Sequence, residues 1–134
     1  MVITPSGEAA VEDADVILLC TSSAGPVIDP ARFSKPALIT SISTNAPRAH
    51  EVPPQCLNAM QVFCDYRHTT TGSAGEMLIA AEQHGWDPRT IVGDLPELLS
   101  EKVQRPTYDR HVFFRSIGLG LEDIALANAL WRQL

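Results

Sequence analysis

Four short apolar runs limit the folds that are open to this sequence. They cover residues 15–21 (DVILLCT), 37–43 (ALITSIS), 61–65 (QVFCD) and 111–114 (HVFF). Near-continuous apolar runs of this length are typical of strands that are buried on both faces of a parallel sheet. Helices or loops fill the segments between them, so the pattern predicts an α/β fold with a mostly parallel sheet.

Helix signals lie between and after these runs. We expect helices over residues 6–14, 51–58, 73–84 and 121–133, and a short one that starts at Pro96. Ser6 is a possible N-cap of the first of these helices. Ser73 and Glu76 have the spacing of a capping box, and Gly85 is suited to end the same helix.

Small and polar residues follow three of the predicted strands. They are residues 21–23 (TSS), 43–45 (STN) and 65–68 (DYRH). Ligands of open parallel sheets bind in the crevice beyond the carboxyl ends of the strands. These segments are therefore the first candidates for a binding site, and Asp65 and His68 are weaker candidates than the others.

Composition narrows the class of protein. The chain has 134 residues, a hydrophobic content of 45% and a formal net charge of −6, which fits one globular domain. It has no Lys/Arg cluster for phosphate contacts, so we expect no nucleic-acid partner. No apolar run approaches the ~18 residues of a membrane span, and no signal peptide is recognisable, so we expect a cytoplasmic protein without a membrane partner.

Cysteine and histidine spacing favours neither a disulfide framework nor a metal site. The three cysteines are widely spaced and form no C-x-x-C pair. Cys20 and Cys64 lie in apolar runs and are expected to be buried. The histidines lack the spacing of metal ligands, so no metal is predicted.

The segment from Phe113 to Ala129 (FFRSIGLGLEDIALANA) joins a strand to an apolar helix through Ser116 and two glycines. Glycine allows the backbone to approach a ligand closely, and a helix start offers unpaired N–H groups. Such a junction can hold the polar edge of a cofactor. The alternative is a capped C-terminal helix without a ligand.

The sequence contains no G-x-G-x-x-G fingerprint, P-loop or G-x-S-x-G elbow. If the chain is part of a dinucleotide-binding domain, it corresponds to the second half of that domain.

Four segments in order resemble the C-terminal part of the ornithine cyclodeaminase/mu-crystallin family. They are residues 14–28 (ADVILLCTSSAGPVI), 37–52 (ALITSISTNAPRAHEV), 62–77 (VFCDYRHTTTGSAGEM) and 113–127 (FFRSIGLGLEDIALA). The resemblance implies that residues 1–134 are the C-terminal part of a Rossmann-type NAD(P)-binding domain, with 113–134 as its closing strand and helix. The resemblance also implies that the family's N-terminal substrate and dimerisation region is not among these 134 residues. With it go the glycine fingerprint and the lysine and arginine that hold the substrate carboxylate.

Within the family, the resemblance is greatest to ketimine reductases. These use NADPH or NADH to reduce cyclic imino acids, Δ1-piperideine-2-carboxylate and Δ1-pyrroline-2-carboxylate, to L-pipecolate and L-proline. Asn45 stands where ornithine cyclodeaminases carry an aspartate. An amide cannot transfer a proton at useful pH but can hydrogen-bond a ring nitrogen or a water. Without the resemblance, the favoured explanation of Asn45 is a turn residue before Pro47.

The resemblance also implies roles for individual residues. Thr21 and Ser22 would contact the cofactor near its ribose, and Ile42 would pack against the nicotinamide region. Ser116 would hydrogen-bond the carboxamide edge, and Asn45 would face the substrate as the catalytic position. Glu51 matches a family position, with a capping or hydrogen-bonding role as the alternative. A homodimer is expected for the full-length form.

Two other hypotheses remain open at this point. One is a lyase resembling ornithine cyclodeaminase, with tightly held NAD, which Asn45 does not favour. The other is a protein that is not an enzyme, either a fragment or a ligand-binding relative in the manner of mu-crystallin.

Overall fold

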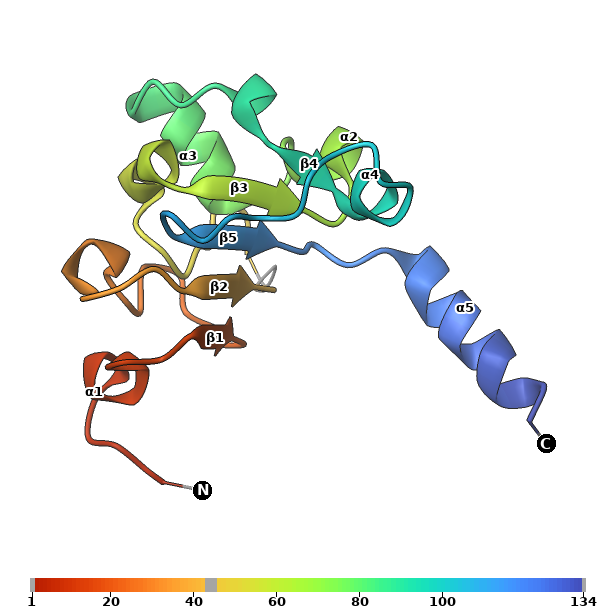
Figure 1. The fold of residues 1–134 in the computed structure, drawn as a ribbon, viewed down its shortest axis with the longest axis horizontal. Coiled ribbons are helices and arrows are strands. Elements are labelled where there is room, and N and C mark those ends of the chain that lie inside the picture. Colours follow the sequence, from red (N-terminus) through yellow and green to blue (C-terminus); the bar gives the residue numbers. More distant parts are fainter. Residues whose placement is uncertain (1, 43–45, 134) are drawn as a thin grey trace.

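Five parallel strands form the centre of the computed structural model, which describes residues 2–42 and 46–133. Their order in the sheet is β1-β2-β5-β3-β4, and all of them point the same way (Figure 1). The strands are β1 (Val16–Leu19), β2 (Leu38–Ser41), β3 (Gln61–Cys64), β4 (Gly93–Asp94) and β5 (Val112–Arg115). The predicted α/β class with a mostly parallel sheet is confirmed.

Helices occupy most of the connections. The α-helices are α1 (Gly7–Val11), α2 (Arg67–Thr70), α3 (Gly75–Gln83), α4 (Leu95–Leu99) and α5 (Gly120–Trp131), and the 3-10 helices are η1 (Pro30–Arg32), η2 (Pro54–Ala59) and η3 (Pro88–Thr90). The Ser6 side chain accepts a hydrogen bond from Ala9 N at 3.2 Å, which confirms Ser6 as the cap of α1. The helix expected over residues 51–58 is the 3-10 helix η2.

One face of the sheet carries the hydrophobic core. Ile17, Ile39, Phe113 and Val62 pair in register across β1, β2, β5 and β3 and are all buried. Side chains from α3 and η2 belong to the same core, among them Met77, Ala80 and Leu57. Because side chains alternate along a strand, the next residues on this face are Leu19, Ser41, Arg115 and Cys64. The core therefore runs into polar side chains at the carboxyl edge of the sheet.

The opposite face is covered unevenly. Phe63 and Val112 are buried there, whereas Val16 and Leu18 on β1 are 56% and 70% exposed. The expectation that the 15–21 run is buried on both faces is therefore wrong for β1, because no other part of the described chain covers its outer face. Cys20 is exposed for the same reason, and Cys64 is buried as expected.

The start of α3 differs from its sequence signal. Its N-cap is Ala74, with no side-chain hydrogen bond at the cap, so the capping box of Ser73 and Glu76 does not form. The Glu76 side chain is fully buried instead. The start of α3 lies close to the backbone of Ala49, and only glycine fits there. A Cβ on Gly75 would lie 2.3 Å from the carbonyl oxygen of Ala49. Gly85 follows the helix with a φ of +65°, as expected of a glycine stop.

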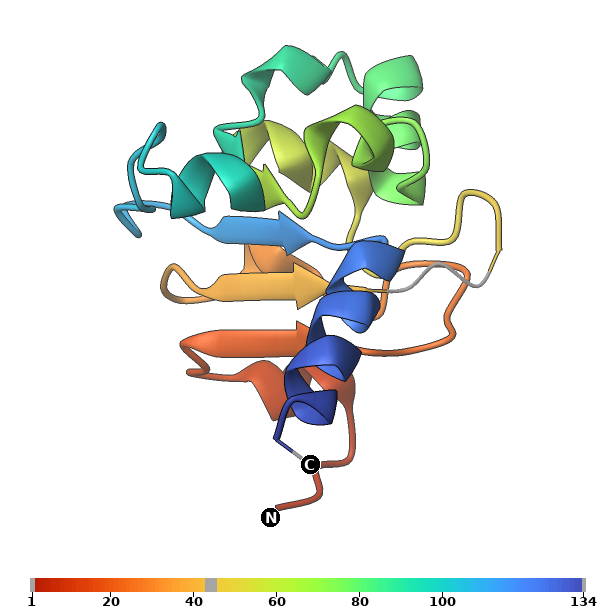
Figure 2. The same ribbon diagram turned by 90° about the vertical axis from the view of Figure 1, so that its right-hand side faces the viewer.

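Helix α5 leaves the tip of β5 and extends away from the body of the molecule (Figure 1). In the view of Figure 2, the helix faces the reader and crosses in front of the strands. None of its residues is buried. Its exposed apolar side chains are Leu121, Ile124, Leu126, Leu130 and Trp131. Trp131 is 76% exposed, whereas Trp86, in the body of the molecule, is buried.

Candidate functional site

The carboxyl edge of the sheet brings four of the five predicted site residues together. Ser116 N donates to Ser41 O at 3.0 Å, and Ile42 N donates to Leu19 O at 3.4 Å. These bonds continue the ladders beyond β5, β2 and β1. Thr21, Ser22, Ile42 and Ser116 therefore follow three adjacent strands at one edge of the sheet. Asn45, the fifth, lies outside the described residues.

These side chains are accessible. Thr21 and Ser22 are exposed, Ile42 is 52% exposed and Ser116 is half-buried. An apolar side chain flanked by hydroxyl groups suits the face and polar edge of a nicotinamide. The exposed residues therefore fit a nicotinamide cofactor in their chemistry, and their individual roles stay predictions.

Glu51 lies directly below this edge and is fully buried. Its Oε1 accepts a hydrogen bond from Thr21 N at 2.7 Å, and its Oε2 accepts one from Ser41 Oγ at 2.7 Å. The carboxylate thus ties the end of β1 to the end of β2. Of the two roles considered from sequence, hydrogen bonding is what the structure shows for Glu51.

Arg115 is the buried cation of the edge, and sequence reasoning missed it. Its Nη1 donates to Ser41 Oγ at 3.3 Å and to Ser116 O at 3.1 Å. Its Nε lies 2.6 Å from Glu76 Oε1, and the two side chains are only 1% and 0% exposed. Burial raises the pKa of Glu76, and the charge of Arg115 opposes that shift. A signal was present, because Arg115 is two residues after the core residue Phe113 and so points to the same face.

Asp65 organises the turn that follows β5. Its Oδ2 accepts from Ser116 Oγ at 3.0 Å, from Ile117 N at 2.8 Å and from Gly118 N at 3.0 Å. Its Oδ1 accepts from Tyr66 N at 2.8 Å and from the Thr70 hydroxyl. Burial works to raise the pKa of Asp65, but these hydrogen bonds outweigh it and leave the pKa below its ordinary value. Asp65 is therefore an ionised anchor of the turn.

The buried Cys64 is a poor nucleophile. Burial and the nearby carboxylates of Asp65 and Asp94 raise the pKa of the thiol to about 12. Because the thiolate is the reactive form, this cysteine is inert near neutral pH.

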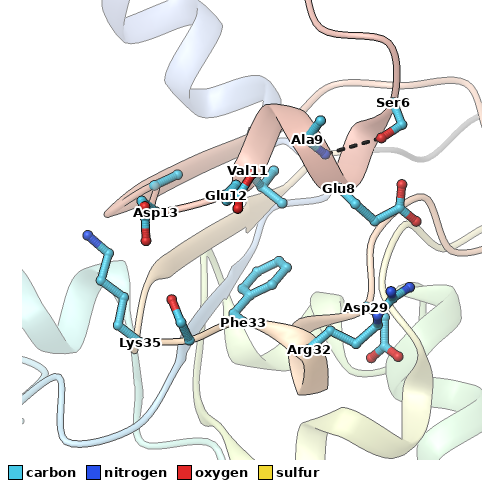
Figure 3. A pocket seen from close by; sticks show the side chains of 12 residues that line it. Ser6, Glu8, Ala9, Val11, Glu12, Asp13, Asp29, Arg32, Phe33 and Lys35 are labelled. Atoms are coloured by element: carbon cyan, nitrogen blue, oxygen red, sulfur yellow. Dashed lines mark hydrogen bonds between the residues drawn. The ribbon is translucent and has the colours of Figure 1, made fainter.

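A cavity of about 580 Å³ lies elsewhere, between α1 and residues 29–35 (Figure 3). These segments precede β1 and β2, so the cavity is at the amino edge of the sheet. Its lining carries both charge signs, including Glu8, Glu12, Arg32 and Lys35. Thr21, Ser22, Ile42 and Ser116, the predicted site residues that the structure describes, do not line it, and the candidate site remains the carboxyl edge.

Within residues 2–42 and 46–133, no group of three or more His, Cys, Asp or Glu side chains is placed to hold a metal ion. No helix there is long and apolar enough to cross a membrane.

Comparison with known proteins places this sheet in a family. The model of the ornithine cyclodeaminase/mu-crystallin family matches residues 1–134. The chain belongs to this family. The resemblance seen in the four sequence segments is thereby confirmed.

Among curated relatives, the NAD(P)H-dependent anabolic L-arginine dehydrogenase of Pseudomonas aeruginosa is 73% identical over 125 residues, which are 93% of this chain and 40% of the relative. The Δ1-pyrroline-2-carboxylate reductase of Colwellia psychrerythraea is 26% identical over 94% of this chain and 40% of its own length. The chain thus spans 40% of the length of these two relatives.

A solved structure supports the fold. The Δ1-pyrroline-2-carboxylate reductase of Thermococcus litoralis, in complex with NADH and L-proline, superimposes with a TM-score of 0.85 at 21% identity, over 93% of this chain and 39% of that one. The sheet matches part of an α/β structure that was solved with a nicotinamide cofactor.

Proposed function

We propose that this chain forms the nicotinamide side of an oxidoreductase that uses NADPH or NADH to reduce the C=N bond of a 2-imino acid. The observation that carries the proposal is the accessible row of Thr21, Ser22, Ile42 and Ser116 at the carboxyl ends of β1, β2 and β5. That edge is where parallel α/β sheets bind ligands. The 73% identity to an NAD(P)H-dependent dehydrogenase supports the same cofactor.

Each edge residue contacts a different part of the cofactor. Thr21 and Ser22 contact it near the ribose, Ile42 packs against the nicotinamide ring, and Ser116 hydrogen-bonds the carboxamide. The cofactor supplies a hydride to the imine carbon, and a proton reaches the imine nitrogen, so that the product is an amino acid. Glu51, Asp65 and Arg115 keep the edge residues in place, and Asn45 faces the substrate.

The substrate we favour is the imine of the 2-oxo acid that corresponds to L-arginine. This choice follows from the 73% identical relative, an L-arginine dehydrogenase. The second candidate is a cyclic imino acid, Δ1-piperideine-2-carboxylate or Δ1-pyrroline-2-carboxylate, because a relative 26% identical to the chain is a Δ1-pyrroline-2-carboxylate reductase. Both candidates share a C=N bond next to a carboxylate. The proposal includes a cytoplasmic homodimer.

The test uses a chimera in which this chain replaces the matching part of the Pseudomonas aeruginosa L-arginine dehydrogenase. NADPH and NADH oxidation is followed with the arginine 2-oxo acid plus ammonia, and separately with Δ1-piperideine-2-carboxylate. The unaltered relative is the control. We expect turnover in the chimera, faster with the arginine-derived imine. Faster turnover of the cyclic imine would favour the second substrate.

Two other results would replace the proposal. Ammonia release from ornithine without net cofactor oxidation would indicate a lyase, which the amide at Asn45 disfavours because it cannot transfer a proton. A folded chimera that is inactive with every imine would indicate a protein that has lost catalysis.

A further inference from the structure

The hydrogen-bonding capacity of Ser116 is almost fully used within the chain. A hydroxyl group has one hydrogen to donate and two lone pairs that accept. Ser116 Oγ lies 3.0 Å from Asp65 Oδ2. It also accepts a hydrogen bond at 3.1 Å from Gly118 N, whose single hydrogen is shared with Asp65 Oδ2. One lone pair of Ser116 is left for a ligand.

The direction of the bond between Ser116 and Asp65 follows from the other partners of that carboxylate. Asp65 Oδ2 also accepts from the backbone N–H groups of Ile117 and Gly118, at 2.8 and 3.0 Å. Asp65 Oδ1 accepts from Tyr66 N and from the Thr70 hydroxyl. An ionised carboxylate surrounded by donors has no hydrogen to give, so Ser116 is the donor.

From this geometry we infer that Ser116 accepts its hydrogen bond from the cofactor, and that the bond comes from the amino group of the nicotinamide carboxamide. The inference rests on the proposed function. Asp65 is then a positioning residue, because it holds the hydroxyl hydrogen away from the cofactor. Hydrogen bonds in a chain polarise one another, so the carboxylate behind Ser116 also makes its oxygen a stronger acceptor. The carboxamide turns its amino group, and not its carbonyl oxygen, toward the end of β5.

A cofactor analogue separates the two orientations. The reduced 3-acetylpyridine analogue of NADH keeps the carbonyl oxygen but carries a methyl group where the amide has N–H donors. Dissociation constants for NADH and for this analogue are measured by fluorescence titration of the chimera and of its Ser116→Ala and Ser116→Thr variants. The analogue-to-NADH ratio cancels any effect of the variant that is common to both ligands.

We expect the ratio of dissociation constants to fall by about threefold to tenfold from the parent chimera to Ser116→Ala, the value of one hydrogen bond. Ser116→Thr keeps the hydroxyl and should keep the ratio. An unchanged ratio in Ser116→Ala would overturn the inference while leaving the proposed function intact. If neither ligand bound the folded parent chimera, the proposed function would fail, and the inference with it.

Asp65→Asn tests the positioning role separately. If Asp65 holds the hydroxyl hydrogen, this variant frees Ser116 to donate to a carbonyl oxygen, and the ratio should fall toward that of Ser116→Ala. A purely structural role would weaken both ligands equally and leave the ratio unchanged. Should Asp65→Asn fail to fold, the two Ser116 variants still decide the inference.

Discussion

The carboxyl edge of the sheet and helix α5 differ in how their side chains are surrounded: charged side chains are buried at the edge, and apolar side chains are exposed on the helix. At the edge, Glu76 and Arg115 are buried and paired with one another, and Glu51 and Asp65 each accept several hydrogen bonds. Along α5, large apolar side chains are exposed, with no residue of the helix buried. The charged side chains of the edge therefore find their partners within this chain, whereas no residue of α5 belongs to the buried core. Substitutions should be costly in the first region and nearly neutral in the second.

The strongest test of the edge is Arg115→Met. It leaves Glu76 buried without its cationic partner, so the free energy of unfolding should drop by about 3–5 kcal/mol in urea titrations at neutral pH. Losing Arg115 raises the pKa of Glu76 further. A carboxyl whose folded pKa lies above its unfolded value of about 4.3 destabilises the fold at high pH, and part of the loss should be recovered as the pH falls toward that value.

The control for Arg115→Met is Glu82→Gln. It breaks the ion pair of Arg48 and Glu82, whose side chains are 43% and 53% exposed. Exposed pairs contribute little, so no measurable change is expected. Equal losses in Arg115→Met and Glu82→Gln would contradict the contrast between buried and exposed pairs.

The second comparison uses two glycines. In Gly75→Ala, the new Cβ meets the backbone of Arg48 and Ala49 at 2.3–2.6 Å, and we expect a loss of about 1–3 kcal/mol in the free energy of unfolding. In Gly120→Ala, at the start of α5, no atom lies within 4 Å. The matched variant should be neutral or more stable by up to about 1 kcal/mol. Thermal and urea unfolding measure the stability of both variants. A larger loss in Gly120→Ala than in Gly75→Ala would contradict the comparison.

Acid sensitivity provides a third comparison. The folded pKa of Asp65 lies below its unfolded value of about 3.9, so its ionisation stabilises the fold above that value. This stabilisation is lost as the pH falls from about 4 through the folded pKa. Asp65→Asn should therefore flatten the decline in stability below pH ~4. Glu12→Gln, on an exposed side chain beside α1, is the control, and an equal flattening there would rule out Asp65 as the cause.

The smallest effect is expected on α5. Leu126 is 63% exposed, so Leu126→Ala should change the free energy of unfolding of this chain by less than about 0.5 kcal/mol. Ile39 is fully buried, and Ile39→Ala should cost about 2–5 kcal/mol. A loss above 1 kcal/mol in Leu126→Ala would mean that α5 packs against the chain in solution.

The strands were predictable where local pattern and tertiary packing agree. The runs at 15–21, 37–43, 61–65 and 111–114 coincide with β1, β2, β3 and β5. β4 has two residues, Gly93 and Asp94, and was not predictable because so short a strand has no apolar run. The order of the strands, and the exposure of the outer face of β1, depend on contacts that local patterns do not encode.

The polar contacts were harder to predict because their partners are distant in sequence. Ser73-x-x-Glu76 and Asp94-x-x-Glu97 share one capping pattern, yet only the second forms a capping box. Glu76 instead pairs with Arg115, which lies 39 positions further along the chain. The placement of Ser116 at the carboxyl edge was predictable from its strand, whereas its bond to Asp65 was not. Local pattern therefore located the candidate site but not the network that supports it.

Hydrogen exchange on the chimera, with and without NADPH, tests the central claim most directly. If the carboxyl edge holds the nicotinamide, NADPH should slow amide exchange in residues 19–24 and 114–119. Residues 6–14 and 29–35, around the cavity at the amino edge, should be unaffected. Protection around that cavity, with none at 19–24 or 114–119, would contradict the account.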